Sequence, residues 1–364
     1  MLNSEDPRPG FVQFDRLLNI GRLAEAMAVL ESSDWYRKPR AETLVRRLAI
    51  LVRLARLPEA RLLFGEALAW PASPSLLECL LNFTPVLFWN REREDAWRKL
   101  QDRLEQLSPN GSADGHWHAG YLRIRLQWSL RDREGFGRTV EAYRAVLGSH
   151  PDWNLIAAAE RRLAMPPDHG AGAEKLFCIG LPKTGTTSIA AALRMLGMAH
   201  LDLFNPLSRE IISADDIAVF DSFSDIPCCA AFERLFHEYP KAKFIYTMRP
   251  RAEWAASIAR QNLRLHGLES FAAARAWIAS ADIGWGPEFS RLCHSVLFRY
   301  DGYETAHREY DARVRAFFRG AGTDRFLPFD ATAGDGWAKL CAFLAKPAPA
   351  APFPWENRAP ASEG

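Results

Sequence analysis

The fold of the second half of this chain is decided by one stretch, Leu176-Phe-Cys-Ile-Gly-Leu-Pro-Lys-Thr-Gly-Thr-Thr-Ser188. An apolar run enters a turn that contains two glycines and a proline, and a pattern typical of a helix follows. This order predicts a strand, a loop and the N-terminus of a helix at one point. Backbone N–H groups without helical partners gather there, and they favour a phosphate or sulfate group.

Further short runs of β-type residues follow the first strand. They lie at 217–220, 243–247 and 325–329, and helical stretches separate them. Alternating strands and helices indicate a parallel sheet with crossover helices. We therefore expect an α/β domain with a P-loop-like parallel sheet at residues 174–358.

The first 165 residues have the apolar spacing of helices almost throughout. The run that begins at Gly21, Gly-Arg-Leu-Ala-Glu-Ala, returns as Ala-Arg-Leu-Pro-Glu-Ala from Ala55, 34 residues later. A period near 34 residues resembles tetratricopeptide helical hairpins, with an irregular helical bundle as the alternative. We predict an all-α, tetratricopeptide-like domain at residues 1–165, and a linker rich in proline and glycine at 165–173.

Composition excludes several classes of protein. The chain has 364 residues, with 46 basic and 44 acidic side chains and a net charge of +2, so no charge excess favours nucleic acid. The six cysteines form no CxxC pair, which disfavours a zinc knuckle or a disulfide framework. The N-terminus does not read as a secretory signal, and no apolar run suits a transmembrane helix. We expect a cytoplasmic location.

The glycine-containing loop differs from a nucleotide P-loop at one position. Gly180 and Gly185 have the GxxxxG spacing, but the next residue is Thr186 where a P-loop has lysine, and the lysine lies inside the loop at 183. The loop is similar to the 5′-phosphosulfate loop of sulfotransferases that use 3′-phosphoadenosine-5′-phosphosulfate (PAPS). The resemblance implies that Lys183 contacts the bridge between phosphate and sulfate. It also implies that the co-substrate is bound by Pro182, Lys183, Thr184, Gly185, Thr186, Thr187 and Ser188.

A second segment carries the same resemblance. Lys-Phe-Ile-Tyr-Thr-Met-Arg249 is a predicted strand followed by a basic turn, and Ser257 lies on the helix after it. A guanidinium and a hydroxyl together suit one phosphate. In sulfotransferases, the equivalent residues hold the 3′-phosphate of PAPS. Pro250 follows Arg249 directly, whereas the family usually has one residue between them.

Transfer of a sulfuryl group to a hydroxyl needs a base within hydrogen-bond reach of the attacking oxygen. The family's His-Leu-Pro element, which carries its catalytic histidine, has its counterpart here at Asp225-Ile-Pro. A carboxylate can act as the base if burial raises its pKa. We predict Asp225 as the base, then Asp221, then His200; a helix cap is the alternative role of Asp225.

Cytosolic members often have an aromatic residue near the adenine at the position of Ser188, which leaves the partner of the adenine open. Trp285, on a predicted loop, is a candidate for contact with the acceptor. The resemblance covers residues 174–358.

We predict a PAPS-dependent sulfotransferase that modifies a hydroxyl of a glycan or small molecule, with no metal. One alternative is a P-loop nucleotide kinase or NTPase. The other is a helical-repeat scaffold with a degenerate nucleotide-binding domain, in which stacked hairpins bind a protein partner or mediate self-association.

Overall fold

A computed structural model describes residues 8–33, 36, 38–107, 117–165, 174–279, 286–320 and 324–356. The predicted linker falls almost entirely outside these ranges, and so does Trp285. The chain forms two compact units. One contains Met1–Ser149, Leu207–Arg209 and Ala259–His294; the other contains His150–Pro206, Glu210–Ile258 and Ser295–Gly364. The units therefore alternate along the chain, whereas the domains predicted at 1–165 and 174–358 are continuous.

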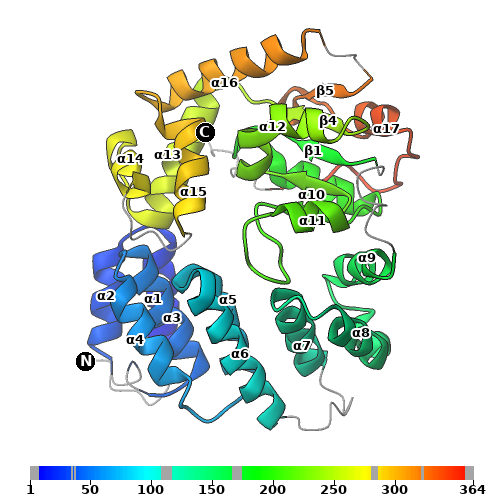
Figure 1. Cartoon of the computed structure of the whole chain (residues 1–364). Coiled ribbons are helices and arrows are strands. Elements are labelled where there is room, and N and C mark those ends of the chain that lie inside the picture. The colour runs from blue at the N-terminus through cyan, green and yellow to red at the C-terminus, as the bar shows by residue number, and fades with distance from the viewer. Residues whose placement is uncertain are drawn as a thin grey trace. The chain divides into compact units, whose positions relative to one another are not determined.

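The first unit is built from helical hairpins (Figure 1). Its N-terminal helices are α1 (Arg8–Asn19), α2 (Leu23–Glu31), α3 (Ala41–Arg53), α4 (Leu57–Ala67), α5 (Pro74–Leu87), α6 (Asn90–Leu107), α7 (Trp117–Ser129) and α8 (Arg133–Leu147). Consecutive helices pack in pairs: α1 with α2, α3 with α4, α5 with α6, and α7 with α8. The expected all-helical N-terminal region is confirmed.

Three of these hairpins share one turn. Gly21, Ala55 and Arg131 each have a positive φ, of 77°, 57° and 60°. In each case the next residue donates its N–H to a carbonyl five residues back, as from Arg22 to Leu17 at 3.0 Å. The repeated Gly-Arg-Leu and Ala-Arg-Leu motifs therefore mark the same left-handed helix end, which glycine adopts most easily.

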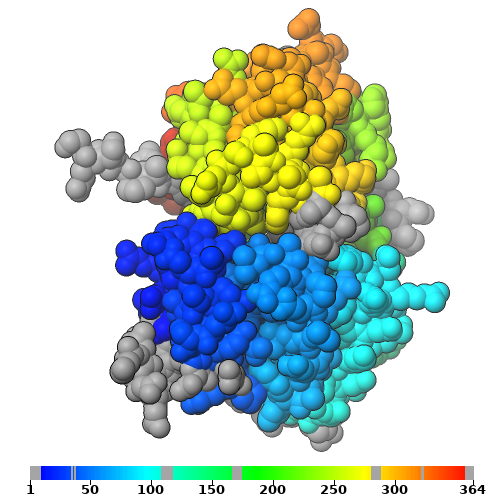
Figure 2. All heavy atoms as spheres, turned by 90° about the vertical axis from the view of Figure 1, so that its left-hand side faces the viewer, coloured from blue at the N-terminus to red at the C-terminus, as the bar shows by residue number. Residues whose placement is uncertain are grey.

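Later residues complete the first unit. They are the second half of α13 (Arg251–His266), α14 (Phe271–Ala279) and α15 (Gly286–Cys293). A side chain at Gly21 would place its Cβ 2.1 Å from the carbonyl oxygen of Leu263. Figure 2 shows this later segment, in yellow, against the blue N-terminal helices. Gly21 is therefore required both by its turn and by close packing.

The second unit contains a five-stranded parallel sheet in the order β2-β3-β1-β4-β5. The strands are β1 (Leu176–Cys178), β2 (His200–Asp202), β3 (Ser222–Ser224), β4 (Lys243–Thr247) and β5 (Phe326–Phe329). The helices are α9 (Trp153–Leu163), α10 (Thr186–Met195), α11 (Ala214–Val219), α12 (Ile226–Glu238), the first half of α13, α16 (Tyr303–Phe318) and α17 (Trp337–Leu344). Short η3 (His294–Phe298) and η4 (Ala331–Ala333) helices also occur. The predicted α/β fold is confirmed.

Alternating side chains divide the two faces of the sheet. On one face, Phe177 and Phe244 contact each other with tilted rings, and Phe244 also contacts Phe236 of α12 and Phe318 of α16. The other face is covered by α10, α17 and the segment after α17, which share a core that includes these residues: Leu176, Cys178, Ile189, Ile245, Phe329, Leu340 and Phe353. Both faces are buried, as a parallel sheet requires.

One predicted strand is wrong. Residues 217–220 lie mostly in α11, where Ser213 and Asp216 form a capping box at the helix start. The strand comes afterwards, at Ser222–Ser224. This correction changes which end of the strand Asp221 occupies.

Candidate functional site

The loop between β1 and α10 follows the central strand of the sheet, at the carboxyl end of that strand. Lys183 and Gly185 have positive φ angles of 72° and 101°. Gly185 is the N-cap residue of α10 and offers no side chain to the first-turn amides. Those N–H groups have no partner within a helix, so the loop presents them to an anion.

Close packing against β4 fixes the course of this loop. A Cβ atom on Gly180 would lie 1.8 Å from Thr247 Oγ1, so no larger residue fits there. Thr184 Oγ1 lies 2.7 Å from Thr247 Oγ1 and donates to the carbonyl of Leu181 at 2.6 Å. The hydroxyl of Thr184, predicted as a ligand contact, therefore holds the loop itself together.

Two buried aromatic residues support the loop from behind. Trp254 Nε1 donates to the carbonyl of Pro182 at 2.7 Å, and Tyr310 Oη donates to the carbonyl of Ile179 at 2.5 Å. Both side chains are almost completely buried. Sequence reasoning missed these supports, because an aromatic residue in a helix most often signals packing alone.

The predicted phosphate-binding residues of the loop differ in exposure. Thr187 is exposed, while Thr186 and Ser188 are buried in the first turn of α10. The hydroxyl of Ser188 accepts a hydrogen bond from the backbone of Glu356 at 3.0 Å. Thr187 is thus the most accessible hydroxyl of the three.

The second predicted element meets the loop directly. Arg249, two residues after β4, approaches the carbonyl oxygen of Lys183 with Nη1 at 3.5 Å. Its Nε makes no hydrogen bond within the described part of the chain, although Glu253 Oε2 lies 3.5 Å away. A guanidinium nitrogen without a hydrogen-bond acceptor is suited to donate to an anion from outside the chain.

Ser257 lies on the inner side of α13, three residues after Trp254, and is 9% exposed. His307 Nε2 lies 3.2 Å from the carbonyl oxygen of Arg249 and fixes the backbone of the turn. Burial lowers the pKa of His307, so its neutral ring is favoured.

Asp225 follows β3 at the same edge of the sheet. It is the N-cap residue of α12, with a φ of 72°, and its Oδ1 accepts from the N–H of Ile226 at 2.6 Å. Desolvation and the charge of Asp202 raise the pKa of Asp225 to about 7, while the Ile226 hydrogen bond and Lys183 lower it less. The carboxyl group is therefore both a helix cap and a titratable group next to Lys183.

Asp202 is a site residue that sequence reasoning missed. It ends β2, and its Oδ1 accepts a hydrogen bond from Ser224 Oγ at 2.6 Å. The strands β2 and β3 are neighbours, so Asp202 and Asp225 meet at their carboxyl ends. An acidic residue at the end of a strand could have indicated Asp202 as a site residue. The strand β2 has only three residues, however, so the sequence pattern does not reveal it.

His200 is completely buried within β2. Its Nδ1 lies 2.9 Å from Ser222 Oγ and its Nε2 lies 3.0 Å from Ser224 Oγ. Burial holds the pKa of His200 well below its usual value. With both nitrogens engaged by serines, the ring does not suit the role of a base, and it instead orients the Ser224 hydroxyl that binds Asp202.

Asp221 does not fit the role of a base. It precedes β3 and so lies at the amino edge of the sheet, opposite the loop. Its Oδ2 accepts from the N–H of Ala199 at 2.9 Å, and its charge faces Lys175. The predicted strand at 217–220 would have ended just before Asp221 and placed it at the carboxyl edge. The observed strand begins after Asp221, which places it at the amino edge.

Comparison with known proteins finds a family similarity for the C-terminal part of the chain. The sulfotransferase domain family matches residues 215–362, which include Asp225, Arg249 and Ser257. These residues are therefore similar to the sulfotransferase domain family. The match begins after the loop and β2, so Lys183 and Asp202 lie outside it.

A curated relative is the Ava biosynthesis cluster protein M of Aspergillus versicolor. The two proteins are 25% identical over 208 residues, which cover 50% of this chain and 79% of the relative.

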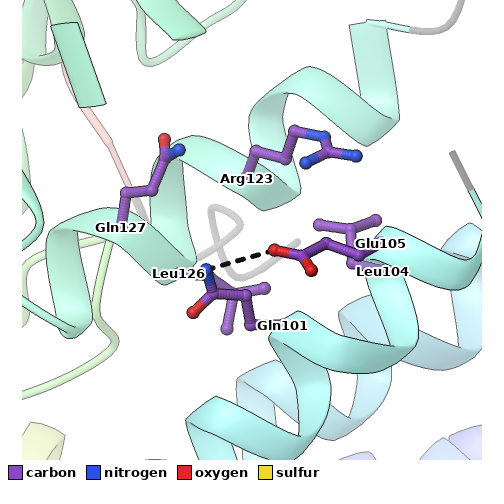
Figure 3. A pocket seen from close by; sticks show the side chains of 6 residues that line it. All are labelled: Gln101, Leu104, Glu105, Arg123, Leu126 and Gln127. Carbon is purple, nitrogen blue, oxygen red and sulfur yellow. Dashed lines mark hydrogen bonds between the residues drawn. The ribbon is translucent and has the colours of Figure 1, made fainter. Parts of the chain in front are cut away.

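Elsewhere, a small cavity of about 40 Å³ lies between α6 and α7 (Figure 3). It is lined by Gln101, Leu104, Glu105, Arg123, Leu126 and Gln127. Sites for drug-sized ligands measure roughly 300–1,000 Å³, so this cavity is too small for a nucleotide.

Two features are absent from the described residues. No helix there is long and apolar enough to cross a membrane. No group of three or more His, Cys, Asp or Glu side chains in those ranges is arranged to hold a metal ion.

Proposed function

We propose that this protein transfers a sulfuryl group from PAPS to a hydroxyl of a glycan or small molecule. The observation that carries the proposal is the approach of Arg249 to the carbonyl oxygen of Lys183, at 3.5 Å. It joins two anion-binding elements at one edge of a sulfotransferase domain. A nucleotide with a charged group at each end suits this pair.

In this proposal, the loop binds the phosphosulfate end of PAPS. The first-turn amides of α10, Lys183 and Thr187 contact the 5′-phosphosulfate, with Pro182, Thr184, Gly185, Thr186 and Ser188 forming the loop around it. Arg249 and Ser257 hold the 3′-phosphate. The uncapped N-terminus of α10 supports this assignment. So does Arg249, whose Nε lies 3.5 Å from Glu253 Oε2 but makes no hydrogen bond within the described residues.

The reaction is a direct in-line transfer. The acceptor oxygen attacks sulfur, a new O–S bond forms, and the bond from sulfur to the 5′-phosphate oxygen breaks. Asp225 takes the proton of the hydroxyl, and the Lys183 ammonium stabilises the charge that develops on the departing phosphate. Fixed positive charge at a developing anion is usually a large contribution to catalysis.

The pKa of Asp225, raised to about 7, suits a general base near neutral pH. Asp202 helps to set that pKa by like-charge repulsion. We therefore replace Asp221 by Asp202 as the second carboxylate of the site.

We propose that residues 1–165 form a tetratricopeptide-like region and residues 174–358 the transferase domain. The shared turns at Gly21, Ala55 and Arg131 support a hairpin repeat. Such a region binds a protein partner or mediates self-association. A cytoplasmic location remains part of the proposal.

The test is transfer of radiolabelled sulfate from PAPS, together with calorimetry of 3′,5′-ADP binding. We expect the wild-type protein to bind 3′,5′-ADP, and Lys183→Ala to lose turnover. Lys241→Ala, which removes an exposed lysine outside the site, is the matched control and keeps activity. Absence of 3′,5′-ADP binding by the wild type would refute the proposal, and magnesium-dependent ATP hydrolysis would favour the kinase or NTPase alternative.

A further inference from the structure

The segment after α17 returns across the face of the sheet that carries α10. Trp337 Nε1 donates to the carbonyl of Ala351 at 2.8 Å. Phe353 is buried against Phe329 at the end of β5 and against Trp337, with ring centroids 5.7 and 5.1 Å apart. This is the first anchor of the segment, and it lies at the carboxyl end of a strand.

A second anchor lies at the phosphate loop. The N–H of Glu356 donates to Ser188 Oγ at 3.0 Å, and Ser188 is 4% exposed in the first turn of α10. The segment therefore runs from the end of β5 to the start of α10. Both points lie at the carboxyl edge of the sheet, on the same edge as the phosphate-binding loop.

Trp355 lies between the two anchors. It is 39% exposed, and its ring meets that of Phe353 edge-on at 6.3 Å. Single exposed apolar side chains are common on proteins, so exposure alone would mean little. What distinguishes Trp355 is its position, because the next residue, Glu356, is bonded to the helix turn that follows the anion-binding loop. A flat aromatic face is the surface on which a nucleobase stacks.

We propose that Trp355 provides the surface on which the adenine ring of the donor nucleotide stacks. The inference rests on the proposed function, because it needs a nucleotide whose phosphates occupy the loop and Arg249. Ser188, small and buried, leaves room for this arrangement and holds the backbone next to the indole. The C-terminal segment is thus part of the donor site, and its bonded residue Glu356 is 168 residues along the chain from Ser188.

Calorimetry separates stacking from phosphate binding. The ligands are 3′,5′-ADP and the abasic sugar 1-deoxyribose 3,5-bisphosphate, titrated into the wild type, Trp355→Ala and Trp355→Phe. Loss of one stacked base weakens binding by about tenfold or more. We expect that loss for 3′,5′-ADP with Trp355→Ala, substantial recovery with Trp355→Phe, and equal binding of the abasic ligand by all three proteins.

Met195→Ala is the matched control, because it also shortens an exposed apolar side chain of the same unit, at 43% exposure. It should bind both ligands as the wild type does, and thermal unfolding should show that all variants fold.

Two results would overturn the stacking assignment while leaving the transferase intact. One is unchanged binding of 3′,5′-ADP by Trp355→Ala. The other is an equal loss of the abasic ligand, which would make Trp355 a structural residue. Failure of the wild type to bind 3′,5′-ADP would instead refute the proposed function itself.

Discussion

Arg249 Nη1 lies 3.5 Å from the carbonyl oxygen of Lys183, so the turn after β4 directly contacts the loop after β1. The two strands are neighbours in the sheet, and Trp254 makes a second link through the carbonyl of Pro182. The loop and the turn that carries the arginine are therefore linked by two contacts, and changes in either should affect both ends of a bound nucleotide.

Replacing Lys183 by alanine should lower kcat by roughly 10²–10³, the usual effect of removing one group that stabilises a developing anion. Binding of 3′,5′-ADP should weaken less, because Arg249 and the loop amides remain. The measurement is initial-rate kinetics with PAPS beside calorimetry. Equal kcat in the variant and in Lys241→Ala would contradict the assigned role.

The rate should depend on pH through Asp225. Only the ionised carboxylate accepts a proton, so kcat/KM should rise with pH and level off above about 7. Asp202→Asn removes a negative charge that raises the pKa of Asp225, so the midpoint should move to lower pH. A profile unchanged by Asp202→Asn would show that the two carboxylates do not interact.

The titration of Asp225 should also make the free energy of unfolding depend on pH. A carboxyl whose folded pKa is raised contributes stability below its unfolded pKa, and that contribution is lost as pH rises through about 7. Asp225→Asn keeps the helix cap but cannot ionise. From pH 4 to pH 8, stability should therefore shift in favour of the variant, by at most about 4 kcal/mol. Urea unfolding at several pH values measures this, and parallel curves for both proteins would disprove it.

Gly180→Ala should disrupt the loop. The added Cβ would stand 1.8 Å from Thr247 Oγ1 and 2.6 Å from the Thr247 carbonyl oxygen, so the loop or β4 must move. We expect a loss of stability of about 1–3 kcal/mol from overpacking and a large loss of 3′,5′-ADP affinity. Gly320→Ala, which meets nothing within 4 Å, is the control. Wild-type melting and binding by Gly180→Ala would contradict this packing.

Removing the hydrogen bond from Trp254 to the loop should weaken binding of the donor more than binding of the acceptor. Trp254→Phe keeps the ring but removes the hydrogen bond to the Pro182 carbonyl, which costs about 1–3 kcal/mol for a buried acceptor. KM for PAPS should rise while KM for the acceptor stays the same. Steady-state kinetics with each substrate varied separately distinguishes the two effects.

The sequence predicts most of the sheet. The sequence predicts β1 and β4 because burial on both sides leaves a continuous apolar run. It also predicts β5, an edge strand that is mostly half-buried but whose residues are apolar as well. The strands β2 and β3 were missed. Each of these strands has only three residues. Three of those residues, Ser222, Ser224 and His200, are polar and buried, and His200 is hydrogen-bonded to both serines. Polar pairs of this kind do not read as a strand.

The site could be predicted in part. Glycine spacing located the loop, and the order of the two basic elements located Arg249. The choice between Asp221 and Asp225 depended on where one strand begins, which a three-residue strand does not reveal. The supports from Trp254 and Tyr310 depend on contacts across 72 and 131 residues, and no local pattern carries them.

The contact between the loop and Arg249 implies that the proposed site selects donors by the spacing of their anionic groups. In the proposed donor site, the loop holds one anionic group of the donor and Arg249 the other, and the two elements contact each other. Adenosine 5′-phosphosulfate lacks the 3′-phosphate, so it would contact the loop but not Arg249. We therefore expect it to bind more weakly than PAPS, although no residue repels it.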